Sequence, residues 1–204
     1  MKQPTIDVTR SAVLFHNMLN GAIKSSIKDN SKAVAESGFL ERCARLQHGA
    51  RERGIPIFWV RVEHRPDGKD RANVLTDKSL AAGGRQSLPI ALPGSAEGAN
   101  IAGSEIRPED YDVVKPRFDP FIGTDLEISL RVRGIDTILM AGITAHTGGI
   151  ESCARGARDR DFNVVVVRDC CFGDVPELHR WSLESVLPYY ARVMTSDEVF
   201  ALLD

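Results

Sequence analysis

The chain has 204 residues, a formal net charge of -2 and 43% hydrophobic residues, the composition of one ordinary globular domain spanning residues 1–204. Basic residues are interleaved with acidic ones, so neither a nucleic acid nor an anionic membrane surface is expected as a partner. No apolar run approaches the roughly 18 residues that cross a bilayer. Residues 1–5 carry no apolar secretion segment, so a cytoplasmic location is expected.

Short apolar, β-branched runs alternate with longer amphipathic stretches along the chain. In chain order the pattern predicts a strand at residues 11–15, a helix at 32–53, strands at 56–62 and 112–115, a helix at 124–133, a strand at 137–143, a helix at 149–161, a strand at 163–168, a helix at 177–191, a strand at 192–195 and a final helical turn from 197. Thr124 and Glu127 match a capping box, and Gly134 is placed to end that helix. The alternation predicts an α/β fold, a single three-layer domain with a mostly parallel sheet of about six strands and helices on both faces.

One long segment, residues 64–111, breaks this alternation. It is rich in Gly, Pro, Asp and Ser, and a connection of this length inside a compact domain is usually either functional or disordered. In sheets of the predicted type, ligands bind beyond the carboxyl ends of the strands. The segments to inspect for a site are therefore those that follow Phe15, Val62, Val114, Ile143 and Arg168.

Three of these segments carry motifs. Residues 17–22 are Asn-Met-Leu-Asn-Gly-Ala, residues 113–121 are Val-Val-Lys-Pro-Arg-Phe-Asp-Pro-Phe with Thr-Asp-Leu at 124–126, and residues 142–152 are Gly-Ile-Thr-Ala-His-Thr-Gly-Gly-Ile-Glu-Ser. In this order, from about residue 11 to the C-terminus, the chain resembles the isochorismatase-like (cysteine hydrolase) superfamily. Members typically carry Asp-Met-Gln-Asn-Asp-Phe at the first motif, a lysine followed by aromatic residues at the second, and a helix that starts at a nucleophilic cysteine at the third.

The resemblance implies a three-residue mechanism. A cysteine at a helix N-terminus has a lowered thiol pKa, an aspartate takes its proton, and a lysine stabilises charge on both. The thiolate attacks an amide or carbamoyl carbon while helix N–H groups hold the oxyanion. Matched position by position, the lysine is Lys115, the aspartate position holds Asn17, and the cysteine position holds Gly148 or Gly149.

The two counts for the cysteine position differ because this turn is one residue longer than the usual form. Counting from Gly142 gives Gly148, and counting back from Glu151 gives Gly149. Asn17 replaces the general base, because a carboxamide accepts no proton at neutral pH. The isochorismatase branch itself places glycine at the cysteine position but uses the aspartate, so neither mechanism of the family is intact in this chain.

The remaining polar residues near the motifs give further candidates. His16 is interpreted as a hydrogen-bonded core histidine that faces away from the pocket, and all four cysteines, Cys43, Cys153, Cys170 and Cys171, as core residues. The side-chain-free helix start at Gly148 and Gly149, with Lys115, predicts an anion site. The residues expected to bind substrate are His146, Thr147, Phe118, Phe121, Arg117 and Glu63. Glu63, His64 and Asp67 lack the spacing of the nicotinamidase metal site, so no metal and no cofactor are expected.

Two functions remain open on these observations. The first is hydrolysis of a small amide, carbamoyl or related anionic metabolite by a modified mechanism. The second is a catalytically silent relative that binds a small anionic ligand or a partner chain. The resemblance also implies a homodimer or homotetramer, for which Trp181, Leu183, Tyr189 and Tyr190 are candidate contact residues.

Overall fold

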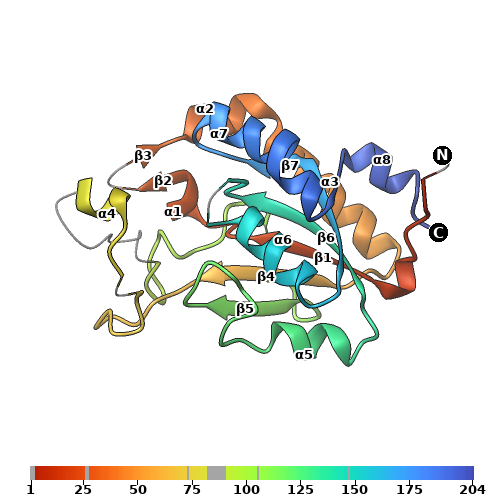
Figure 1. The fold of residues 1–204 in the computed structure, drawn as a ribbon, viewed down its shortest axis with the longest axis horizontal. Helices are drawn as coiled ribbons and strands as arrows, with labels where there is room; N and C mark the ends of the chain where they lie inside the picture. The colour runs from red at the N-terminus through yellow and green to blue at the C-terminus, as the bar shows by residue number, and fades with distance from the viewer. Residues whose placement is uncertain (1–2, 26–27, 73, 82–90, 105, 147) are drawn as a thin grey trace.

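The main sheet has six strands: β1 (Ser11–His16), β4 (Ile57–Val62), β5 (Tyr111–Lys115), β6 (Thr137–Ile143), β7 (Asn163–Phe172) and β8 (Arg192–Met194). They lie in the order β5-β4-β1-β6-β7-β8, and each neighbouring pair is parallel. A computed structural model describes residues 3–25, 28–72, 74–81, 91–104, 106–146 and 148–204. The predicted α/β fold with a parallel sheet of six strands is confirmed (Figure 1).

Two separate cores make the molecule three-layered, because alternate side chains of each strand point to opposite faces of the sheet. Val13 and Phe15 of β1 pack in one core with α2 (Ser31–Ser37), α3 (Phe39–Glu52) and α8 (Ser196–Phe200). Ala12 and Leu14 pack in the other core with α5 (Leu126–Arg131) and α6 (Ile150–Arg158). Every residue of β1 is buried, as expected for a strand covered on both faces.

Shorter elements complete the fold. They are a 3-10 turn η1 (Val8–Arg10), α1 (Asn20–Ile23), a hairpin of β2 (Lys24–Ser25) and β3 (Lys28–Asp29), α4 (Asp77–Ala81), α7 (Pro176–Trp181), a π-helical turn η2 (Ser182–Val186) and a 3-10 turn η3 (Leu187–Tyr189). The two ends of the chain lie side by side (Figure 1), where the Ile6 N–H donates to the Leu202 carbonyl. None of the helices that the structure describes has both the length and the apolar character needed to cross a bilayer.

The helices differ from their predicted bounds for identifiable reasons. The helix predicted over residues 32–53 is two helices, because Gly38 adopts a left-handed conformation (φ 66°) between them. The helix predicted from residue 124 begins at Leu126, and Thr124 accepts the Leu126 N–H and donates to the Pro120 carbonyl instead of forming a capping box. The segment 177–191 is divided into α7, η2 and η3, and Gly134 follows α5 with φ 69° as expected.

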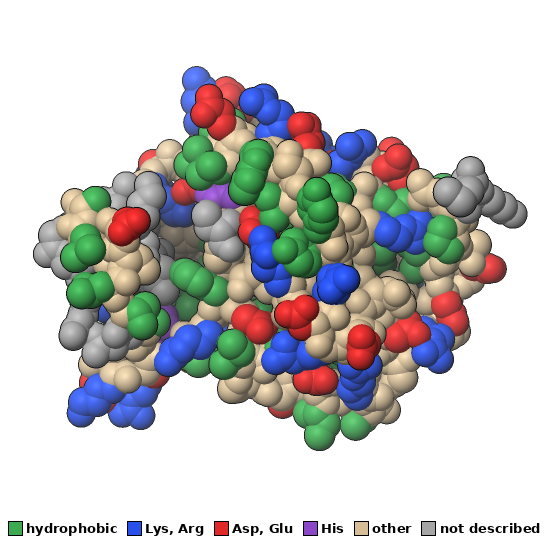
Figure 2. Space-filling model, viewed as in Figure 1, with side chains coloured by type: hydrophobic (Ala, Val, Ile, Leu, Met, Phe, Trp, Pro, Cys, Tyr) green, Lys and Arg blue, Asp and Glu red, His purple; other side chains and the backbone are tan. Residues whose placement is uncertain are grey.

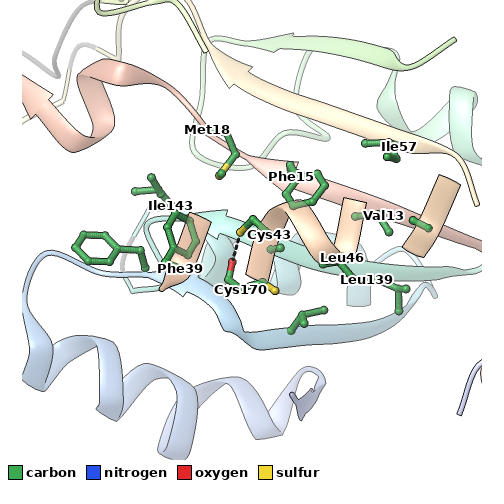
Figure 3. Close-up of a cluster of buried hydrophobic side chains, with 14 of the residues drawn as sticks. Val13, Phe15, Met18, Phe39, Cys43, Leu46, Ile57, Leu139, Ile143 and Cys170 are labelled. Atoms are coloured by element: carbon green, nitrogen blue, oxygen red, sulfur yellow. Dashed lines mark hydrogen bonds between the residues drawn. The ribbon is translucent and has the colours of Figure 1, made fainter. Parts of the chain in front are cut away.

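The cysteines lie in the two cores, as the sequence predicted. All four are buried and free. Figure 3 shows Cys43 on α3 facing β7, where its Sγ lies 3.5 Å from the Cys170 carbonyl among Phe15, Leu46 and their neighbours. Burial raises the pKa of the Cys43, Cys153 and Cys171 thiols. These thiols are therefore packing residues and poor nucleophiles.

The expected contact residues for self-association divide into two kinds. Trp181 and Tyr189 are exposed, whereas Leu183 packs against a core and Tyr190 lies under the Arg155 guanidinium at 4.2 Å. The homodimer or homotetramer stays a prediction.

Candidate functional site

A cavity of about 240 Å³ opens at the carboxyl end of the sheet. Its described lining comes from residues at the ends of β1, β4, β5 and β6, from the start of α6, and from α1, β3 and the connection before β5. Figure 2 shows the surface hollowed on the left of the view, beside the N-terminal end of α6. The site is therefore where a parallel sheet is expected to bind a ligand.

The structure brings together the four residues matched to the catalytic positions. Asn17, Lys115, Gly148 and Gly149 all line this cavity, although they come from two strand ends and one helix start. Parallel strands direct their carboxyl ends to one edge of the sheet, so motifs separated by more than a hundred residues converge there.

Lys115 is a buried cation at the end of β5. It shares the sheet face of Val113, only 1% of it is exposed, and its ammonium donates to the Arg117 carbonyl at 2.9 Å. Burial lowers the pKa of Lys115 from 10.5 to about 8, against opposing influences of Cys153 and Asp119. The side chain is thus mainly charged at neutral pH, and it loses its proton as the pH rises through about 8.

Asn17 follows β1, which is separated from the strand of Lys115 by β4. It leaves β1 with a left-handed backbone (φ 48°), its N–H donates to the Val60 carbonyl, and its Oδ1 accepts the Val62 N–H at 3.0 Å. Val62 is the residue paired with Lys115 between β4 and β5. With Oδ1 so engaged, the group that Asn17 presents to a ligand is its Nδ2 donor.

The turn between β6 and α6 supplies the third side of the cavity. The Ile150 N–H donates to the Thr144 carbonyl at 2.8 Å and the Glu151 N–H to the Ala145 carbonyl at 3.3 Å, so these helix-start donors are engaged within the turn. The backbone of Gly148 and Gly149 is what this helix start presents to the cavity. The predicted anion site therefore has fewer free N–H donors than a helix N-terminus at which every first-turn N–H is unpaired.

The charge of the lining favours an anionic ligand. Three cationic side chains, Lys28, Lys115 and Arg117, and one carboxylate, Glu97, line the cavity among the described residues. Lys28 is 3.6 Å from Asp174, and Arg117 donates to the carbonyls of Asp70 and Pro116. These contacts hold the two outer cations in place around the buried Lys115.

The residues expected to bind substrate are not all at the cavity. Phe118 and Arg117 line it, with Phe118 50% exposed. His146 is buried, and its Nε2 lies 3.1 Å from Asp174. Glu63 accepts a hydrogen bond from Arg61 at 2.5 Å, and Phe121 packs in the core against Phe162. Thr147 lies outside the described residues.

His16 is a hydrogen-bonded core histidine, as interpreted from the sequence. Its ring is fully buried on the sheet face of Ala12 and Leu14, and its Nδ1 lies 2.8 Å from the Ile143 carbonyl. Burial and, secondly, the charge of Lys115 lower the pKa of His16 to about 3. The imidazole is therefore neutral, so Nδ1 donates to Ile143 and adds no charge beneath the cavity.

Two charged residues of the lining were missed by the motif analysis. Lys28 comes from the small β2–β3 hairpin, and Glu97 from the long connection before β5, whose unusual length was the only signal in the sequence. Among the residues that the structure describes, no group of three or more His, Cys, Asp or Glu side chains is arranged to hold a metal ion.

Comparisons with known proteins agree with the geometry. The model of the Isochorismatase domain family matches residues 11–198. The uncharacterized isochorismatase family protein YecD of Escherichia coli O157:H7 is 33% identical, over 80% of this chain and 82% of that protein. N-carbamoylsarcosine amidase of Arthrobacter sp is 29% identical, over 78% of this chain and 59% of that protein. The solved structure of an isochorismatase family protein from Burkholderia thailandensis superposes with a TM-score of 0.80 and 28% identity, covering 99% of each chain.

Proposed function

The chain belongs to the isochorismatase family of hydrolases, and on that premise we propose that it hydrolyses a small anionic metabolite at an amide or carbamoyl bond. The observation that carries the proposal is the buried Lys115 ammonium, which shares one cavity with Asn17 and the side-chain-free start of α6. The excess of cationic side chains around that cavity supports an anionic ligand. The similarity to N-carbamoylsarcosine amidase supports an amide or carbamoyl group as the reacting group.

We propose that water replaces the thiol as nucleophile. Neither Gly148 nor Gly149 has a side chain to attack with, and Asn17 takes no proton. In the proposed step the neutral form of Lys115 takes a proton from water as its oxygen bonds to the carbonyl carbon, and the N–H groups of Gly148 and Gly149 hold the oxyanion. The Lys115 ammonium then returns that proton to the leaving nitrogen as the C–N bond breaks, which releases an acid and an amine.

A catalytically silent binding protein is the second candidate, and Asn17 is the observation that favours it. The same cavity retains the cations that attract an anion, while the carboxylate position holds a carboxamide whose oxygen is engaged by Val62. A silent protein binds the anion best below about pH 8, where Lys115 is charged, whereas turnover by neutral Lys115 rises as the pH increases through about 8.

The decisive experiment is an assay of the unmodified chain against small carboxylate-bearing amides and ureido compounds from pH 6 to pH 9, with ligand-induced thermal shifts measured in parallel. We expect turnover that rises through about pH 8 and is lost in Lys115→Ala. Lys32→Ala, which removes an exposed lysine of α2, is the matched control and should leave turnover unchanged. Thermal stabilisation without turnover would favour the silent protein, and neither effect with any compound would contradict both functions.

A further inference from the structure

The two glycines at the start of α6 are required for different reasons. A Cβ atom on Gly149 would lie 1.9 Å from the Thr144 carbonyl oxygen and 2.7 Å from the Thr144 nitrogen. Contacts this short leave no room for a Cβ atom, so lack of space demands glycine here. Both obstructing atoms belong to the backbone of the turn that supplies the acceptor for the Ile150 N–H, so they have no rotamer by which to move aside.

Gly148 is obstructed by a side chain instead. A Cβ atom there would lie 2.6 Å from both Cδ1 and Cε1 of Phe118. The Phe118 ring is 50% exposed, so rotation about its side-chain bonds is open to it in a way that displacement of a strand-end backbone is not. The three atoms nearest to a Cβ at position 148 thus all belong to one movable side chain, whereas those nearest to a Cβ at position 149 all belong to the backbone.

We infer that Phe118 occupies the space of a residue-148 side chain and is a specificity-determining residue of the cavity. Its ring stands where a Gly148 Cβ atom would lie, so a ligand at the start of α6 meets an aromatic surface beside the Gly148 backbone, in the place of a side chain at position 148. A flat ring surface packs well against a planar amide or carbamoyl group. The inferred ligand is thus planar at the end that meets Phe118.

This inference rests on the proposed function only in taking the cavity as the ligand site. Its first test, a double-mutant cycle on thermal stability, needs neither a ligand nor turnover, so the two proposals can fail separately. The variants are Gly148→Ala and Gly149→Ala, each made in the unmodified chain and in a Phe118→Ala background. Ile122→Ala, a substitution of an equally exposed apolar residue nearby, is the control background.

We expect Gly148→Ala to lower Tm by about 3–10 °C in the unmodified chain and in Ile122→Ala, as overpacking does. The loss should largely disappear in Phe118→Ala. Gly149→Ala should lower Tm by a similar or larger amount in all three backgrounds. An equal loss for Gly148→Ala with and without Phe118, or tolerance of Gly149→Ala, would overturn the inference.

A second readout uses iodoacetamide as a probe of the uncovered position. We expect the thiol of Gly148→Cys to be alkylated at least about tenfold faster when Phe118→Ala is also present, with the label located at residue 148 by peptide mass spectrometry. The four native thiols are buried and provide the background rate, which the Phe118→Ala chain alone measures. Equal alkylation rates in the presence and absence of Phe118 would show that the ring does not occupy this space.

Discussion

The buried ammonium of Lys115 is kept at a cost in stability. The unfolded chain holds this proton up to about pH 10.5 and the folded chain only up to about pH 8, so the unfolded state binds more protons between these values. By linkage, folding stability rises as the pH increases through that window, and the full penalty applies below pH 8. A pKa lowered to this extent corresponds to about 3 kcal/mol.

Lys115→Met should therefore raise the free energy of unfolding at pH 7 by about 1–3 kcal/mol, the lost hydrogen bond to Arg117 offsetting part of the gain. Urea unfolding of both chains at pH 7 and pH 10 measures this, and the advantage of the variant should shrink at pH 10. Lys32→Met is the control and should differ little from the unmodified chain at either pH. A variant less stable at pH 7 would show that Lys115 stabilises the fold.

His16 lowers the stability of the folded chain at acidic pH. The unfolded chain gains a proton on this residue below about pH 6.5, whereas burial delays protonation in the folded chain to about pH 3. The unfolded state again binds more protons between these values, so stability falls as the pH decreases through the window.

The difference in free energy of unfolding between His16→Leu and the unmodified chain should therefore shift in favour of the variant by about 2–3 kcal/mol from pH 7 to pH 4.5. The comparison requires urea unfolding curves at both pH values. His48→Leu, which removes an exposed imidazole from α3, controls for loss of a histidine as such. If the stabilities of His16→Leu and the unmodified chain ran parallel from pH 7 to pH 4.5, the imidazole would have to be protonated in the folded state.

At the scale of elements, one carboxylate joins α3, β4 and the turn before β5. Asp110 Oδ2 accepts hydrogen bonds from Arg51 at 2.6 Å, from the Trp59 indole at 3.0 Å and from the Arg107 N–H at 2.9 Å, and its side chain is 3% exposed. Removal of a buried acceptor leaves its donors without compensation, which costs more than loss of an exposed pair.

Asp110→Ala should accordingly lower the free energy of unfolding by about 3 kcal/mol. Asp112→Ala, two residues further along, removes the 38% exposed partner of Arg61 and should cost no more than about 1 kcal/mol. Chemical unfolding of the two variants side by side tests the contrast. Equal costs would mean that burial of Asp110 adds nothing to its hydrogen bonds.

The elements themselves were well predicted where the signal is local. Runs such as 137–143 and 163–168 are strands because apolar, β-branched residues suit a strand covered on both faces, and the structure confirms them. The apolar spacing at 32–53 continues across Gly38, so the sequence predicted one helix. The left-handed conformation of Gly38 divides it into two. Spacing alone does not reveal the backbone conformation that a glycine adopts.

At the scale of the whole molecule, a chain with net charge -2 concentrates cationic side chains at one cavity. Net charge gave no indication of this, because interleaved charges cancel along the sequence while folding sorts them in space. The long connection 64–111 had no predicted structure, yet it contributes Ala91 and Glu97 to the lining. Its role at the cavity depends on where the strand ends lie, which no local pattern encodes.

The sequence by itself determined the strand and helix alternation, the family, and the candidate positions 17, 115 and 148–149, because each depends on short-range periodicity or on motifs read in order. Only the tertiary structure decided that Lys28 and Glu97 join that cavity, that His146 and Phe121 are engaged elsewhere, and that Gly149 is blocked by backbone while Gly148 is blocked by Phe118. The physical reason is that contacts between residues far apart in the chain depend on strand order and on packing at sub-ångström scale, which sequence patterns do not specify.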